Sequence, residues 1–86
     1  MEIEIECLWH TDETRKKDEM GLDLDPNELE ARTVTFYQII CISPSKGWSD
    51  GIERCNIWIA GDKFISAYSY EETKLMIENK NKNETN

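Results

Sequence analysis

Residues 54–69, RCNIWIAGDKFISAYS, decide the fold, because they contain two apolar runs on either side of a glycine. β-branched and aromatic side chains dominate both runs, as is typical of strands. Gly61-Asp62 fits a two-residue turn with glycine in the first central position. The stretch therefore predicts a β-hairpin, and this turn sets a register in which Ile57 faces Ser66.

The next stretch, SYEETKLMIENK at residues 69–80, predicts a helix. Ser69 and Glu72 have the spacing of a capping box, in which two side chains satisfy free backbone groups of the first turn. A stripe with helical spacing would then face the sheet. It consists of Tyr70, Thr73, Met76 and Ile77.

Two further strands are predicted before the hairpin. MEIEIECLW at residues 1–9 alternates strictly, which predicts a half-buried strand with Glu2, Glu4 and Glu6 on its solvated face. RTVTFYQIICIS at residues 32–43 is rich in β-branched and aromatic residues on both faces. We expect the first strand to have one wet face and the second to need cover on both.

The segment between these strands, residues 10–31, is polar and charged. Within it Asp25 can cap a short helix and Pro26 fits the first helical position. The stretch before Asp25 is longer than most connections between elements. It contributes no further predicted strand.

Together these elements predict an α+β fold. We expect a small antiparallel four-stranded sheet, one C-terminal helix and a short helix in the 10–31 segment. Residues 1–80 would form a single domain, and residues 81–86, which have no apolar side chain to bury, would form a disordered polar tail.

The apolar second face of the middle strands requires a cover, because large exposed apolar patches are rare on free monomers. Three covers are compatible with the sequence. The sheet can curl into a small barrel. Alternatively, a partner can dock on this face, or a second copy can dock there to give a homodimer. In the third alternative the 10–31 segment folds back, with four apolar side chains pointing in: Met20, Leu22, Leu24 and Leu29.

The net charge of −8 is unevenly placed. Residues 1–31 carry eleven acidic and three basic residues, and residues 32–86 carry seven of each. Direct nucleic-acid binding is disfavoured without a basic face, whereas an acidic face suits a basic partner. The chain shows no apolar run of membrane-spanning length and no export signal, and its three cysteines are an odd number, so we expect a cytoplasmic protein without disulfides.

Catalytic and metal chemistry have little support in the sequence. A zinc site would have to combine Cys7, His10, Cys41 and Cys55. In a continued strand His10 would point away from Cys7, and the other two cysteines lack the close paired spacing of zinc ribbons. With a single histidine and no nucleophile motif, we expect no enzyme and no cofactor.

The sequence therefore predicts a small module that functions by binding a protein. The loop SKGWSDG at residues 45–51 contains Trp48, a residue type enriched at interface hot spots, although packing onto the core is the competing interpretation. The alternative function is an acidic inhibitor that mimics nucleic acid against a basic enzyme. The predicted partner contacts are Trp48, Lys46 and Asp50 in the loop and Glu2, Glu4 and Glu6 on the first strand.

Overall fold

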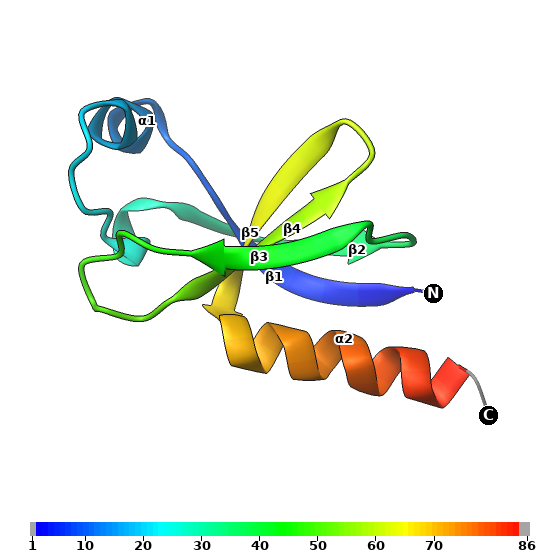
Figure 1. Ribbon diagram of the computed structural model, residues 1–86. Helices are drawn as coiled ribbons and strands as arrows, with labels where there is room; N and C mark the ends of the chain where they lie inside the picture. The colour runs from blue at the N-terminus through cyan, green and yellow to red at the C-terminus, as the bar shows by residue number, and fades with distance from the viewer. Residues whose placement is uncertain (1, 85–86) are drawn as a thin grey trace.

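The computed structural model describes residues 2–84 and shows an α+β fold built on one antiparallel sheet of five strands. The strands lie in the order β2-β1-β5-β4-β3. In chain order the elements are β1 (Ile3–Trp9), α1 (Asp12–Glu19), the single 3-10 turn η1 (Pro26–Glu28), β2 (Glu30–Phe36), β3 (Cys41–Ser45), β4 (Arg54–Ile59), β5 (Asp62–Ser69) and α2 (Tyr70–Glu84). Figure 1 shows α2 lying along one side of the sheet, with α1 at the far end of the molecule from it.

The fifth strand arises because the predicted strand at residues 32–43 is two strands. β2 pairs with β1 along its whole length, and its last residue, Phe36, lies opposite Ile3 at the start of β1. Beyond Phe36 the chain has no more of β1 to pair with. It bends through residues 37–40 and pairs instead with β4, starting with Cys41 opposite Trp58. The prediction of four strands was therefore short by one.

The sheet is curled. β2 and β3 are its two edge strands, yet only residues 37–40 join them. Five extended steps of chain reach about 17–18 Å, whereas the edges of a flat five-stranded sheet lie about 19 Å apart. The register between β1 and β5 contains only Cys7–Ser66 and Leu8–Ile65. The β1–β2 ribbon therefore crosses the β3–β4–β5 ribbon at a short contact, as Figure 1 shows near its centre.

The main core lies inside this curl and is closed by α2. The predicted stripe of α2 faces it, and Thr73 is fully buried with its hydroxyl 2.8 Å from that of Ser66. Ser69 caps the helix by accepting a hydrogen bond from the backbone N–H of Glu72. The buried residues of this cluster are Ile3, Ile5, Cys7, Phe36, Cys55 and Ile57.

A second, smaller core covers the outer face of the sheet. It consists of Leu8, Leu24, Leu29 and Trp48, with Ile65 and Ala67 packed against it. The 10–31 segment does fold back as one of the three predicted covers, but only in part. Leu24 and Leu29 are buried, whereas Met20 and Leu22 are 71% and 51% exposed. The backbone of Leu24 bonds to both Gly47 and Ser49, which ties the segment to the Trp48 loop.

The β4–β5 hairpin forms as predicted, but with its turn one residue earlier. Ile59 pairs with Asp62, so the central turn residues are Ala60 and Gly61, and Gly61 takes the positive φ of 82°. Glycine thus occupies the second central position, as a type II turn requires. Ile57 consequently faces Phe64 and not Ser66. A shift of two residues leaves each side chain on the predicted face.

The 10–31 segment contains two short helical elements. Asp25 caps η1 by accepting a hydrogen bond from the N–H of Asn27, as predicted, but β2 begins at Glu30 and limits the helix to one turn. The prediction missed α1. Its start is fixed by Thr11 and Thr14, each hydroxyl accepting from the other's backbone N–H.

At the C-terminal end, α2 continues to Glu84, past the boundary at residue 80. Residues 85 and 86 of the predicted tail lie outside the described residues. Within the described part of the chain, no helix combines the length and the apolar character needed to cross a bilayer.

Candidate functional site

Trp48, the leading predicted contact residue, belongs to the core of the free chain. Its side chain is only 5% exposed and packs in the second core. The indole N–H donates to the Ser45 hydroxyl at 3.1 Å, and the guanidinium of Arg54 lies 4.9 Å from the ring centroid. Flanking glycines and a loop position thus do not leave this tryptophan available to a partner. The competing interpretation, packing onto the core, is the one the structure shows.

The two charged residues of the same loop differ in their exposure. Lys46 extends into solvent, with its side chain 80% exposed and a loose ion pair to Glu53 at 3.9 Å. Asp50 instead accepts two hydrogen bonds from the guanidinium of Arg54, at 3.0 and 2.9 Å, which lower the pKa of its carboxyl. Asp50 and Arg54 therefore brace Trp48, and Lys46 is the freer of the two predicted contacts.

The acidic row, with Glu2 directly before β1 and Glu4 and Glu6 within it, lies exposed as predicted. Glu2, Glu4 and Glu6 are all exposed, and Glu4 and Glu6 lie opposite threonines of β2. The next residue on that face is Leu8, which the second core covers. The structure therefore places the row beside the covered core and does not merge it with the Trp48 loop into one surface.

The four candidate metal ligands do not converge. Cys7 and Cys55 are buried in the main core, where burial raises the pKa of their thiols to about 12 and about 11. Cys41 is exposed on the edge strand β3, and His10 follows β1, which β5 and β4 separate from β3 in the sheet. Within residues 2–84, no three His, Cys, Asp or Glu side chains are grouped as metal ligands.

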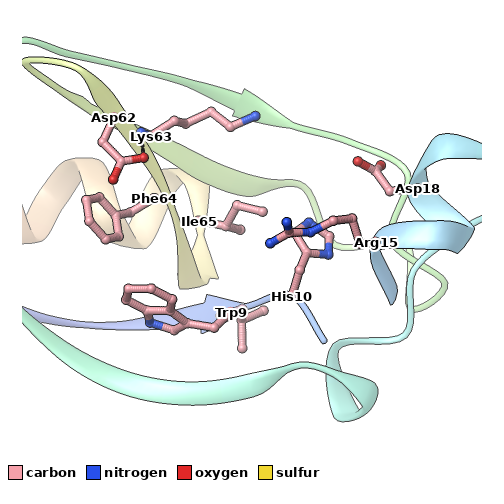
Figure 2. A pocket seen from close by; sticks show the side chains of 9 residues that line it. Trp9, His10, Arg15, Asp18, Asp62, Lys63, Phe64 and Ile65 are labelled. Atoms are coloured by element: carbon pink, nitrogen blue, oxygen red, sulfur yellow. Dashed lines mark hydrogen bonds between the residues drawn. The ribbon is translucent and has the colours of Figure 1, made fainter. Parts of the chain in front are cut away.

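A cleft that the sequence did not predict forms where β1 and β5 separate. Beyond Leu8 and Ile65 the register between these strands ends, and β1 leads away to α1 while β5 leads to the hairpin turn. The gap holds a cavity of about 370 Å³. Figure 2 shows the side chains around it, which are Leu8, Trp9, His10, Arg15, Asp18, Asp62, Lys63, Phe64 and Ile65.

The apolar part of the cleft lining, its floor, consists of Leu8, Trp9, Phe64 and Ile65. Leu8 and Ile65 come from the two strands at their last paired position. Trp9 and Phe64 follow on each side and meet edge to face, with ring centroids 5.6 Å apart. Although Trp9 has the inward parity of β1, it remains 37% exposed because the strands have already separated at this point.

Charged side chains of both signs form the rim. Lys63 directs its ammonium to the ring of Trp58, at 5.5 Å from the centroid, and Asp62 accepts a hydrogen bond from the backbone N–H of Lys63. Arg15 extends from α1 toward Ile65 and His10, whereas Asp18 lies apart at the α1 end of the cleft (Figure 2). Among the described residues, Arg15 makes no ion pair.

His10 is held at the cleft by the cap of α1. Its Nδ1 lies 3.1 Å from the hydroxyl of Thr14, a fully buried residue. When the Thr14 hydroxyl donates to the carbonyl oxygen of Thr11, at 3.1 Å, Nδ1 acts as the donor to Thr14 and Nε2 is left as the acceptor of the ring. The partner that orients this histidine is thus a hydroxyl, in contrast to the carboxylate of a catalytic triad.

The residues that line the cleft come from three separate segments of the chain, so no local sequence motif predicts the cleft. The useful signals were the Thr11–Thr14 spacing before Arg15 and the acidic-to-basic order along residues 12–17. Both indicate a helix that starts directly after the first strand. Comparisons of the chain with family models, with curated proteins and with solved structures find no match.

Proposed function

We propose that this chain is a small protein-binding module without catalytic activity, and that the cleft between β1, α1 and β5 is its contact site. The observation that carries the proposal is the combination of an apolar floor, an exposed tryptophan and a rim with both charges. An apolar centre with a polar rim is the usual anatomy of protein interfaces. Trp and Arg, here Trp9 and Arg15, are among the residue types most enriched at hot spots.

The chemistry of the cleft supports binding over catalysis. His10 is the only histidine of the chain, and its ring partner is Thr14, which is fully buried and occupied by the helix cap. The hydroxyl and thiol nucleophiles that an acyl-transfer site would need are not among the side chains that line the cleft. The lining instead offers area and charge to a ligand surface.

The experiment begins with capture of a partner from the source cell by the full chain, followed by titration of the purified partner. We expect the Trp9→Ala variant to bind at least tenfold more weakly than the wild type, with an unchanged circular dichroism spectrum. A control is Ile52→Ala, which truncates another exposed apolar residue outside the cleft. Equal binding of Trp9→Ala and the wild type would show that the cleft is not the contact site.

The acidic row favours a second candidate function, an inhibitor that mimics nucleic acid. Alternate strand residues lie about 6.6–6.8 Å apart, so Glu2, Glu4 and Glu6 present a regular line of carboxylates on an exposed face. Such an inhibitor would bind a basic enzyme with affinity that falls steeply as salt increases. Cleft binding through an apolar floor would depend weakly on salt, so a titration at two salt concentrations distinguishes the two functions.

A further inference from the structure

We propose that the cleft binds an extended peptide segment of its partner in which a bulky apolar residue is flanked by carboxylate side chains. The inference rests on the proposed function and specifies the ligand of the same site. Three features of the cleft support it: the unpaired strand edges, the size and nature of the floor, and Arg15, a rim arginine with no ion pair among the described residues.

The strand edges come first. Trp9 pairs with β2 on one side, and Lys63 and Phe64 pair with β4, but the register gives none of them a partner across the cleft. Two strands that separate in this way expose backbone donors and acceptors toward the gap. An extended segment can satisfy such edges by lying beside them, as in recognition by strand addition.

The floor accepts an apolar side chain. Leu8 and Ile65 are paired in the register and both line the cavity of about 370 Å³, Leu8 through the small part of its side chain that the second core leaves exposed. That volume is at the lower end of the range for ligand sites, which is about 300–1,000 Å³. It suits one or two side chains of a peptide better than a folded surface or a large cofactor.

Charge on the rim selects the flanking residues. The Lys63 ammonium contacts the ring of Trp58, and Asp62 accepts a hydrogen bond from a backbone N–H. Asp18, the other acidic residue of the lining, lies apart from Arg15 at the α1 end of the cleft (Figure 2). Arg15 has no ion pair among the described residues and extends over the cleft toward His10 and Ile65 (Figure 2). A carboxylate on the ligand is the group that complements it, since guanidinium and carboxylate form strong paired hydrogen bonds.

A preference of the cleft for acidic ligands runs against the net negative charge of the whole molecule. A chain with a net charge of −8 attracts basic ligands at long range. A preference of the cleft for an acidic segment would therefore have to originate at the site itself. The contrast makes the sign of the ligand charge a decisive observable.

The test is a titration of the ¹⁵N-labelled full chain with four pentapeptides that are blocked at both ends. Binding is monitored through the backbone amide chemical shifts of the chain in 0.15 M salt. The probes are Thr-Glu-Leu-Glu-Thr, its Gln and Lys counterparts, and Thr-Glu-Ala-Glu-Thr. We expect the Glu-Leu-Glu peptide to shift the amides of Trp9, His10, Lys63 and Phe64 and to bind about tenfold more tightly than the Lys peptide. The alanine peptide should bind more weakly than its leucine counterpart.

Two variants on α1 complete the test. Arg15→Gln should abolish the preference for glutamate, and Arg15→Glu should reverse it, whereas Lys16→Gln removes the same charge from the neighbouring position and should leave it unchanged. Equal or tighter binding of the Lys peptide to the wild type, or no effect of Arg15→Gln, would overturn the inference. A captured partner that binds Trp9→Ala more weakly than the wild type leaves the proposed function standing despite either result. Failure to capture any partner counts against the proposed function, and the peptide titration then still tests the preference of the cleft.

Discussion

Trp48 and Trp9 occupy the opposite of the environments that their positions in the sequence suggest. Trp48 lies in a glycine-flanked loop, yet it is 5% exposed and packs with three leucines. Trp9 lies in a strand with inward parity, yet it is 37% exposed at the edge of a cleft. The difference arises from long-range pairing. The Trp48 loop is hydrogen-bonded to the backbone of Leu24, whereas β1 is no longer paired with β5 at Trp9.

The comparison predicts its largest effect at Trp48. Replacing Trp48 with alanine removes a buried ring and a hydrogen bond to Ser45, and we expect a loss of about 3–5 kcal/mol in the free energy of unfolding. Denaturant melts measure it. A loss smaller than that for Trp58→Ala, at a 39% exposed position, would break the comparison.

A smaller stability loss is expected at Trp9. Trp9→Ala removes a partly exposed ring that meets Phe64 edge to face, and should cost about 2 kcal/mol. Its principal effect should fall on binding, the reverse of the pattern for Trp48→Ala. Denaturant melts and partner titrations of both variants measure the loss of stability and the loss of affinity. If the ratio of these two losses is the same for Trp9→Ala and Trp48→Ala, the two tryptophans do not differ in role.

The brace of the Trp48 loop predicts a pH dependence. Hydrogen bonds from Arg54 lower the pKa of Asp50 below its ordinary value of 3.8, so the pair stabilises the fold above about pH 4 and loses this contribution as Asp50 is protonated at lower pH. Asp50→Asn lacks the contribution at every pH. The difference in Tm between the wild type and this variant should be present at pH 7 and shrink below pH 4. A difference that persists unchanged at pH 2.5 would contradict the assignment.

The smallest effect is expected on the acidic row. Replacing Glu2, Glu4 and Glu6 with glutamine should alter the free energy of unfolding by about 0.5 kcal/mol or less, because these side chains lie on an exposed face. Thermal melts in low salt provide the measurement. Under the cleft proposal, partner affinity should also change little, whereas a mimic of nucleic acid would lose most of its binding.

The sequence predicted those parts of the fold that depend on local pattern. Alternation identified β1, the capping residue Ser69 and the stripe around Thr73 identified α2, and the side-chain faces of the hairpin were correct despite the shifted turn. These features follow from the period of two or of 3.6 and from local capping. They need no knowledge of which strand lies beside which.

Features that depend on strand pairing escaped prediction. The break after Phe36 is set by the length of β1 opposite it, and the exposure of Trp9 by the point where β5 leaves β1. The cleft could not be predicted for the same reason. Arg15, Trp9 and Phe64 come from three elements, and no local sequence pattern indicates that these elements lie together. For Trp48 the loop position left contact with a partner and packing onto the core both open, and long-range packing with Leu24 and Leu29 decided between them.

The indole N–H signals of the three tryptophans give the most direct test of the central claim, that the chain binds through the cleft at Trp9 while Trp48 stays buried in the second core. The ¹⁵N-labelled chain is recorded free and bound to its captured partner. We predict a large shift or broadening of the Trp9 signal and little change at Trp48, whose N–H stays bonded to Ser45. A perturbed Trp48 signal with an unchanged Trp9 signal would contradict the account.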